Sequence, residues 1–513
     1  MAEHATTELA RLSADQKSLK KDVPDLEAVV STQVGQVTEY SEAEYKRVAR
    51  KIDLHMMPIM FFLYGIQQTD KTSISVQALF GMKTDLHMHG QQYQWLTTIF
   101  YLTYLIGEFP STWLMQKMRI GRVLSCYIVC WSICLLCVSA CQKWHQVLII
   151  RALQGFFESN ISPGFLLITG SYYRNKEHAS RSLFWQSSEG VFSIIANLML
   201  YGIARHVDAV GGIAAWRCIS LFLGSLTLVG AIFSFYLLDS PHDAMWLTAE
   251  EKKIAISRVM ENQISEDRIG KKWDWDQFYE CFRDPQVYFN FLNTFLSCIP
   301  NGAFTTFRSL IYVTFGFDDW QAMLYGHPRD AVYTVAFLAV AFYVQRYQNQ
   351  RMYVMIVACI IPFAGMLVMS LLPNEESTKW LKYAMFILTV LFSLSIFLGW
   401  SFITSNVAGR TKRTTVSSIV FIAYCTGNMV GSQVFRTSDA PRYYNGTIVC
   451  SASFGAQVLV IILWRLWYMR ENRRRDREAA ASGISKEEQL RLGSALGEQD
   501  ITDCNNPHFR YSM

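Results

Sequence analysis

Residues 145–173 read HQVLIIRALQGFFESNISPGFLLITGSYY, an apolar stretch long enough to cross a lipid bilayer. Arg151 and Glu158 are its only formal charges before Arg174. Two helical turns separate them, so they share one face of a helix, roughly 10 Å apart along its axis. A charge at bilayer depth costs roughly 3 kcal/mol, and such groups tend to be functional. Because an arginine can hold an anion and a buried carboxyl group can carry a proton, the pair suggests a membrane transporter that couples an anionic substrate to protons.

The rest of the chain repeats this pattern of long apolar blocks. Of its 513 residues, 51% are apolar and 17% are charged, whereas charge makes up about a quarter of a soluble protein. Six blocks precede the polar stretch 239–285 and six follow it. The twelve blocks lie near 53–74, 93–114, 122–142, 145–172, 182–204, 214–238, 286–311, 325–345, 352–372, 382–406, 414–435 and 447–469. We therefore predict an all-α membrane protein with twelve transmembrane helices in two six-helix bundles, 53–238 and 286–469, and a substrate site between them.

Basic residues at both ends of the chain set the predicted orientation. The N-tail, 1–52, and the C-tail, 470–513, are rich in Lys and Arg, and basic flanks stay on the cytoplasmic side. Twelve spans place both tails and the middle loop, 239–285, on that side. The net charge of +5 then reflects topology, and nucleic-acid binding is not needed to explain it. The N-tail lacks the features of a signal peptide. We expect a multi-pass protein of the plasma membrane, with a disordered polar C-tail.

Three local patterns carry smaller predictions. Thr248-Ala-Glu-Glu251 is a capping box and predicts a short helix in the middle loop. Asn445-Gly-Thr447 is a glycosylation sequon in the loop predicted between spans 11 and 12. Five cysteines recur at helical spacing in span 3, where small residues let helices approach; soft-metal binding is the alternative. They are Cys126, Cys130, Cys134, Cys137 and Cys141. We expect no metal ion and no cofactor.

Several strings between residues 45 and 478 resemble one family when taken together. Span 1 ends QTDKTSIS (68–75), span 2 holds GEFPS (107–111), and span 4 carries RALQGFFE (151–158). SNVAGRTK (405–412) and APRY (440–443) follow later. The set is similar to the fungal allantoate-permease-like branch of the anion:cation symporter family, within the major facilitator superfamily. The resemblance implies proton-coupled uptake of a small organic anion, of the class of allantoate, ureidosuccinate or a vitamin-like carboxylate.

The same resemblance implies roles for four charged residues. Family members carry an acidic-basic pair at the end of span 1, which joins the charges of span 4 in proton coupling. Carried over to this chain, Asp70 and Glu158 are the implied proton carriers. Arg151 is the implied substrate or counter-ion group, with Lys71 as its basic partner. A structural interpretation stays open for both pairs: an ion pair at the water interface for Asp70 and Lys71, and a helix-locking salt bridge for Arg151 and Glu158.

Other polar residues in the predicted spans are weaker candidates. Arg308 stands in span 7 where the family has a small residue. It is a candidate second anchor for a substrate carboxylate, unless it only reaches water at the outer end of its helix. Glu108, toward the cytoplasmic end of span 2, is expected to pair with a nearby Lys or Arg. The remaining candidates for substrate contacts are Tyr64, Gln68, Glu189 and Asn406.

The sequence also bears on other classes of function. The sequence has no phosphate-binding glycine loop, no HExxH and no nucleophile–base constellation, so we expect neither an enzyme nor an ATP-driven pump. Transport of a fungal secondary metabolite, in either direction, is one alternative. A nutrient sensor that keeps the fold but does not transport is another. The expected partners are the anionic substrate, protons and the lipid bilayer, and we expect a monomer.

Overall fold

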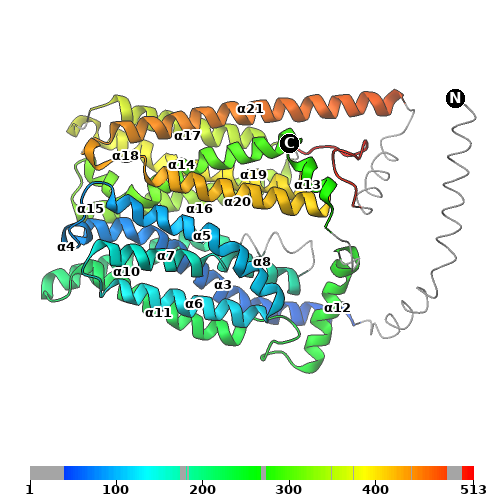
Figure 1. Ribbon diagram of the computed structural model, residues 1–513, viewed down its shortest axis with the longest axis horizontal. Coiled ribbons are helices and arrows are strands. Elements are labelled where there is room, and N and C mark those ends of the chain that lie inside the picture. Colours follow the sequence, from blue (N-terminus) through cyan, green and yellow to red (C-terminus); the bar gives the residue numbers. More distant parts are fainter. Residues whose placement is uncertain are drawn as a thin grey trace, which may run out of the picture.

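The computed structural model describes residues 40–173, 181, 184–266, 273–347, 349–373, 375–440, 442–481 and 500–513. Long helices run along one common axis, and the described residues contain no strand (Figure 1). Helices from the first half of the chain, blue to green, form one side of the molecule, and helices from the second half form the other. This arrangement confirms the predicted all-α fold of two helical bundles.

The first bundle contains the helices of the first six predicted spans. Its fourth span is broken at Ser159 and Asn160, so that two shorter helices continue one another. The helices are α3 (Glu42–Leu79), α5 (Gln92–Lys117), α6 (Ile120–Val138), α7 (Trp144–Glu158) with α8 (Ile161–Tyr172), α10 (Ser188–Val210) and α11 (Ala215–Leu237). The short helix α4 (Met82–Asp85) follows α3. Ser41 and Glu44 form a capping box that fixes the start of α3, ahead of the predicted span.

The second bundle contains the helices of the last six predicted spans. They are α14 (Pro285–Thr314), α16 (His327–Arg346), α17 (Arg351–Leu371), α18 (Lys379–Leu388) with α19 (Phe392–Asn406), α20 (Arg410–Ser432) and α21 (Tyr444–Ala481), with the short α15 (Asp319–Leu324) after α14. Within the described residues, six helical segments are long and apolar enough by themselves to cross a membrane, among them α6, α11 and α17. More polar helices, such as α3 and α14, carry residues of the site described below.

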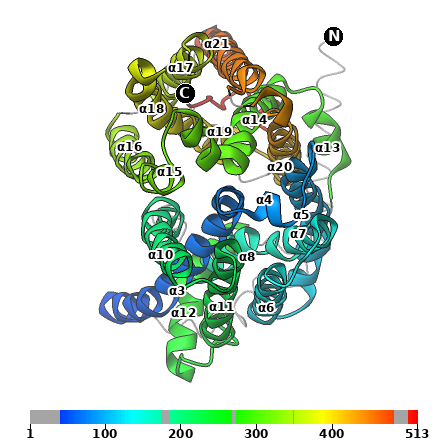
Figure 2. The same ribbon diagram turned by 90° about the vertical axis from the view of Figure 1, so that its left-hand side faces the viewer.

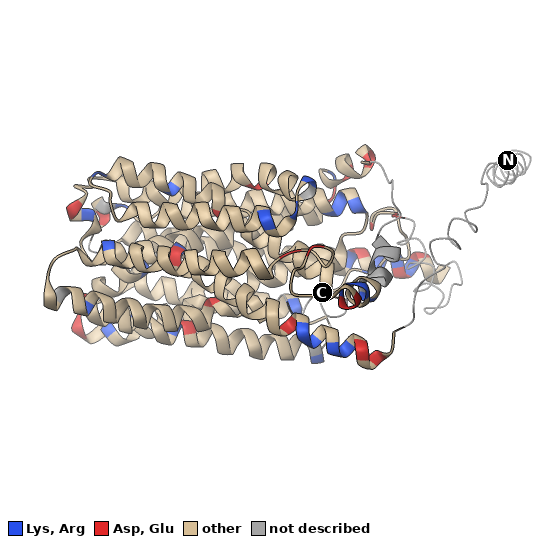
Figure 3. Ribbon diagram, turned by 90° about the horizontal axis from the view of Figure 1, so that it is seen from below, with Lys and Arg blue, Asp and Glu red and all other residues tan. Residues whose placement is uncertain are grey.

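The middle loop holds two further helices, α12 (Ala249–Glu266) and α13 (Trp275–Cys281). Glu251 N donates to Thr248 Oγ1 at 3.3 Å, and Thr248 N donates to Glu251 Oε2 at 3.0 Å. The predicted capping box is therefore confirmed. The start of α3, the helices α12 and α13 and the C-terminus lie at one end of the molecule, called the tail end below, and α4 and α15 lie at the opposite, far end (Figure 1). Charged residues are densest toward the tail end (Figure 3).

Hydrogen bonds join the two bundles close to the far end. Tyr93 Oη on α5 donates to the carbonyl oxygen of Thr306 on α14 at 2.5 Å. From the same helix, Gln94 Nε2 donates to the carbonyl oxygen of Phe435 at 2.9 Å, and the hydroxyl oxygens of Thr98 and Ser432 are 2.7 Å apart. Figure 2 views the molecule from this end. These contacts close the far end of the interface between the bundles.

The C-tail contradicts our expectation of disorder wherever it is described. Helix α21 continues to Ala481, and residues 500–513, called the C-terminal segment below, pack on the tail end of the second bundle. Asn406 Nδ2 donates to the carbonyl oxygen of Ser512 at 2.8 Å, and the rings of Tyr468 and Tyr511 stack with centroids 4.7 Å apart. The prediction is wrong here because aromatic and amide side chains dock the segment on a folded surface, which composition alone does not reveal.

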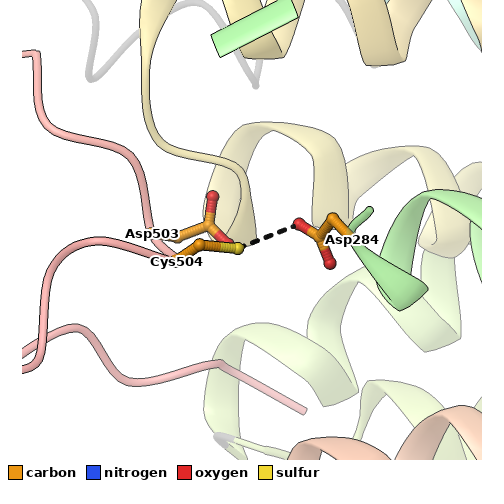
Figure 4. Close-up of side chains that lie close together, drawn as sticks. All are labelled: Asp284, Asp503 and Cys504. Carbon is orange, nitrogen blue, oxygen red and sulfur yellow. Dashed lines mark hydrogen bonds between the residues drawn. The ribbon is translucent and has the colours of Figure 1, made fainter. Parts of the chain in front are cut away.

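A buried ion cluster fastens the C-terminal segment. Lys412 Nζ at the start of α20 lies 2.6 Å from Asp284 Oδ2, 2.9 Å from Asp503 Oδ1 and 2.9 Å from Glu280 Oε1. Cys504 Sγ donates to Asp284 at 3.5 Å (Figure 4). Asp284, Asp503 and Cys504 are spaced closely enough to hold a metal ion. The Lys412 ammonium group already supplies the positive charge at this point, so the cluster is an ion-pair network.

Candidate functional site

A cavity of about 470 Å³ lies between the two bundles. The first bundle contributes residues of α3, α5 and α10 to its wall, and the second contributes residues of α14, α16, α19 and α20. Glu108 and Pro163 extend this wall toward the tail end, beyond the contacts that close the far end. The cavity is therefore placed where the predicted substrate site should lie.

The first of two buried ion pairs beside this cavity joins α3 to α7. Asp70 Oδ1 lies 3.8 Å from Arg151 Nη1, and the indole N–H of Trp131 on α6 donates to Asp70 Oδ2 at 3.1 Å. Asp70 is fully buried and Arg151 is nearly so. Neither residue belongs to the wall of the cavity. Asp70 and Arg151 therefore form an ion pair behind the residues that line the cavity.

The second ion pair reaches the cavity itself. Lys71 Nζ lies 3.1 Å from Glu158 Oε1, and it also lies over the ring of Tyr104, 5.2 Å from the centroid. Lys71 lines the cavity, whereas Glu158 is fully buried behind it. Each of the two charges on α7 is therefore matched by an opposite charge on α3. The structure does not pair Arg151 with Glu158, so the alternative of a salt bridge within span 4 is not what forms.

The positions of the four charged residues along their helices explain why the ion pairs form between α3 and α7 rather than within α7. Adjacent residues on a helix point about 100° apart, so Asp70 also reaches Trp131 on α6, whereas Lys71 also reaches Tyr104 on α5. Arg151 and Glu158 lie on one face of α7, as the sequence predicts, but two turns apart. Gly155, between them, brings α7 close to α5, because a Cβ at this position would overlap the carbonyl oxygen of Phe100. The four charges therefore meet in two separate pairs at two depths.

The weaker candidates from the sequence divide into two groups. Tyr64, Gln68 and Glu189 all line the cavity, and Glu189 Oε2 accepts a hydrogen bond from Tyr333 Oη at 3.1 Å. Asn406 lies outside the cavity wall, at the tail end of α19, and bonds to the C-terminal segment.

Arg308 lines the cavity, but its guanidinium group is already engaged. Its Nη2 atom lies 2.7 Å from Asp330 Oδ2 and donates to the carbonyl oxygen of Gly326 at 2.8 Å. Ser193 Oγ of the first bundle donates to the same Asp330 oxygen at 2.9 Å. The Arg308–Asp330 pair therefore touches both bundles.

Glu108 differs from expectation. It lines the cavity, and its Oε2 atom is buried with no hydrogen-bond partner among the described residues. Among the described residues, Glu108 also forms no ion pair with a nearby Lys or Arg, contrary to our expectation.

Asn445, the asparagine of the predicted glycosylation sequon, lies exposed in the first turn of α21, where its Nδ2 donates to Asp439 Oδ2 at 3.0 Å.

Sequence reasoning missed Arg329, on the first turn of α16. The residue is 7% exposed and lines the cavity. Its guanidinium carbon lies over the rings of Phe304 and Phe386, 5.4 and 5.6 Å from their centroids. Its Nε atom has no hydrogen-bond partner among the described residues. The available signal was the adjacent charges Arg329 and Asp330, which both fall inside the predicted span 325–345.

Comparison with known proteins agrees with this geometry. Residues 60–432 match the Major Facilitator Superfamily. An uncharacterized transporter of Schizosaccharomyces pombe is 33% identical over 475 residues, which cover 92% of this chain and 88% of that protein. The allantoate permease of Saccharomyces cerevisiae is 30% identical over 498 residues, covering 95% of this chain and 90% of the permease. The crystal structure of a D-xylose-proton symporter has the same fold, with a TM-score of 0.61 at 11% identity over 80% of this chain and 97% of the symporter.

The helices, the cavity between two bundles and these relatives lead to one assignment. The match to the superfamily covers most of the chain, and two relatives of at least 30% identity align along nearly its whole length. The resemblance found in the motifs of spans 1, 2 and 4 is confirmed. The chain is an integral, multi-pass membrane protein that belongs to the Major Facilitator Superfamily, in the fungal allantoate-permease-like group of its transporters.

Proposed function

We propose that this protein is a proton-coupled symporter that takes up a small organic anion across the fungal plasma membrane. The observation that carries the proposal is the Lys71–Glu158 pair at the cavity wall, with Nζ and Oε1 3.1 Å apart. A lysine at the wall can bind an anion, and a carboxyl group directly behind it can carry a proton. Relatives that include an allantoate permease support the anion class.

The pair suggests how the proton and the anion would be coupled. When Glu158 is ionised, its carboxylate neutralises Lys71. When Glu158 takes up a proton, Lys71 loses its counter-charge and becomes free to bind the substrate anion. Each ligand then favours binding of the other, and this reciprocity is required of any coupling free energy. Asp70 and Arg151 form a second pair of the same kind, and Asp70 is the candidate for a second proton site.

The charge balance decides which gradient drives uptake. A monoanion that moves together with one proton carries no net charge, so the membrane potential does no work on it. The pH gradient then supplies about 1.4 kcal/mol for each pH unit. A second proton, carried on Asp70, would add a net positive charge and make uptake sensitive to the potential, at about 2.3 kcal/mol per 100 mV. Uptake measured at several clamped potentials separates the two stoichiometries.

We infer that the tail end is cytoplasmic and that the protein works as a monomer. The concentration of basic residues toward the tail end supports this orientation, because basic flanks stay inside. The contacts that close the far end, such as Tyr93 to Thr306, then correspond to a conformation in which the cavity communicates with the cytoplasm. Uptake requires the alternative conformation, in which these contacts open.

The test is uptake in fungal cells that lack their own anion permeases. A labelled panel of small carboxylates is offered at acidic and neutral outside pH, with and without a protonophore. We expect one compound to accumulate, more at acidic pH, and to be lost when the protonophore is added. A protein that reaches the surface and binds but never accumulates a compound would be a sensor, and efflux of an internal metabolite would make it an exporter.

The variant Glu158→Gln tests the coupling residue directly. It is expected to keep exchange of labelled for unlabelled substrate, because Lys71 stays free, but to lose accumulation against a gradient. Glu251→Gln is the matched control, since Glu251 forms an ion pair with Lys51 at the tail end, away from the cavity. Undiminished, pH-dependent accumulation by Glu158→Gln would contradict its role.

A further inference from the structure

We propose that Arg329 holds the carboxylate of the substrate, and that the substrate is a monocarboxylate with a flat, largely apolar body. The inference rests on the proposed function and deepens it by naming the anchoring residue in the second bundle and the chemical class. Three observations carry it: the unused donors of Arg329, the engagement of the charges around it, and the aromatic wall of the cavity.

Within the described ranges, Arg329 is the cation of the cavity wall that forms no ion pair. Lys71 is paired with Glu158, and Arg308 is paired with Asp330. Arg329 forms no ion pair or hydrogen bond among the described residues, although it is only 7% exposed and lines the cavity. A guanidinium group has five N–H donors in a fixed plane, which match the two oxygens of a carboxylate. A buried charge without a partner is unfavourable, so this side chain is suited to a counter-charge that arrives with the substrate.

Each of the charged groups near Arg329 is engaged by another partner. They are Arg308, Asp330 and Glu189. Asp330 Oδ2 is held by Arg308 and Ser193, at 2.7 and 2.9 Å, and Glu189 Oε2 accepts a hydrogen bond from Tyr333. None of these contacts is made to Arg329 itself, on which the negative charges of Asp330 and Glu189 act only through space. These contacts also cross between α10 and α16, so an anion bound to Arg329 would act at a contact between the two bundles.

Aromatic side chains form much of the remaining wall. They include Tyr101, Tyr104, Phe304, Tyr333, Trp400 and Tyr424. Arg329 already lies over the ring of Phe304, so a flat molecule whose carboxylate reaches the arginine meets ring faces next to it. A ureide such as allantoate carries many hydrogen-bonding groups, and each group that meets a ring face instead of a polar residue of the wall, such as Gln68 or Thr305, would cost free energy. A guanidinium group that has no ion-pair partner among the described residues, next to aromatic rings, fits a carboxylate on an apolar ring.

The inference is tested by equilibrium binding to the purified full-length protein, which avoids the leak of lipophilic acids through membranes. Isothermal titration calorimetry compares four probes: benzoate, benzamide, cyclohexanecarboxylate and allantoate. Benzamide has the shape of benzoate without its charge, and cyclohexanecarboxylate has the charge without the flat ring. We expect benzoate to bind more tightly than each of the others. The preference over benzamide is expected to be about tenfold to a hundredfold, as for a charge-assisted hydrogen bond.

Two variants assign the preference to Arg329. Arg329→Gln is expected to lose most of the preference for benzoate and to keep only what Lys71 supplies when Glu158 is protonated. Arg329→Lys is expected to keep more of the preference because it keeps the charge. Arg205→Gln is the matched control: Arg205 also lies over an aromatic ring, 4.4 Å from the centroid of Trp320, but outside the cavity wall. A melting curve for each variant establishes that it is folded before binding is compared.

The outcomes separate this inference from the proposed function. If Arg329→Gln keeps the wild-type preference for benzoate over benzamide, Arg329 is not the anchor. If allantoate binds more tightly than benzoate, the flat apolar class is overturned, while proton-coupled anion uptake stands. If no carboxylate binds to folded protein, the inference fails, and the uptake assay above decides separately whether the proposed function fails with it.

Discussion

Replacing Lys412 by Met tests how the C-terminal segment is held. Lys412 is fully buried and lies within 3 Å of carboxylate oxygens of Asp284, Asp503 and Glu280. Its removal leaves three carboxylates facing one another with no cation between them. Replacing Asp503 by Asn instead removes one of three negative charges around a lysine that keeps two partners. The two changes break the same 2.9 Å contact between Lys412 and Asp503 but have opposite effects on the charge balance.

The expected magnitudes differ accordingly. Removing one partner of a buried ion pair costs about 3–5 kcal/mol, because an uncompensated charge stays buried. For Lys412→Met this lowers the docking equilibrium of the C-terminal segment by roughly two to four powers of ten. Asp503→Asn loses one charge-assisted hydrogen bond but also relieves repulsion from Asp284, so we expect about 1 kcal/mol, less than a tenfold change. Lys51→Met, which breaks a partly exposed pair with Glu251 at the same end, should cost about 0–1 kcal/mol.

Hydrogen–deuterium exchange read by mass spectrometry measures this docking in the purified full-length protein. Peptides from the C-terminal segment report its opening, and peptides from α17 report whether the second bundle stays folded. We expect fast exchange in the segment of Lys412→Met, nearly wild-type exchange in Lys51→Met, and an intermediate rate in Asp503→Asn. If Asp503→Asn opens the segment as much as Lys412→Met, or if Lys412→Met does not exceed Lys51→Met, the charge-balance argument is refuted.

Three further predictions concern packing, pH and topology. Gly155→Val should lower the apparent melting temperature and the free energy of unfolding, the latter by about 1–3 kcal/mol, because the valine side chain would overlap the carbonyl oxygen of Phe100. An unchanged melting curve would contradict the close packing of α7 on α5. The hydrogen bond from Lys51 lowers the pKa of Glu251 below its ordinary 4.5, so the contribution of this pair to the contact between α3 and α12 is complete above that value and is lost as pH falls through the lowered pKa; hydrogen-exchange protection factors at the start of α12 should therefore be lower at pH 3 than at pH 6, and the reverse order would contradict the sign. Asn445→Gln should abolish an endoglycosidase-sensitive shift on a gel, and a wild-type protein without such a shift would leave the sequon unused.

Much of the architecture could be predicted from the sequence because bilayer spans leave a strong one-dimensional signal. Twelve apolar blocks, a polar stretch between the sixth and seventh, and basic tails are enough to predict two bundles. Helices cover all twelve blocks in the described part of the chain. The break of span 4 at Ser159 and Asn160 and the extension of α21 to Ala481 were not predicted, because neither changes the apolar pattern.

The candidate site could be predicted only in part. The family resemblance grouped Asp70, Lys71, Arg151 and Glu158, and in the structure they form two ion pairs between α3 and α7. Neither the resemblance nor the sequence could reveal which acid faces which base, because that depends on the relative rotation of α3 and α7. Arg329 was missed for a similar reason: its importance comes from Arg308, which takes Asp330 as its own partner.

Composition and helical period along the chain are enough to predict that the protein spans a membrane, folds as two bundles and carries charges at bilayer depth. Tertiary structure alone decided how the charges are paired, which cation is left facing the cavity, and that a polar tail packs on the second bundle. Contacts between Lys412 and Asp503, or Glu189 and Tyr333, join residues far apart in the chain. Their free energy depends on distance and burial in the folded protein, and neither quantity is encoded in local sequence pattern.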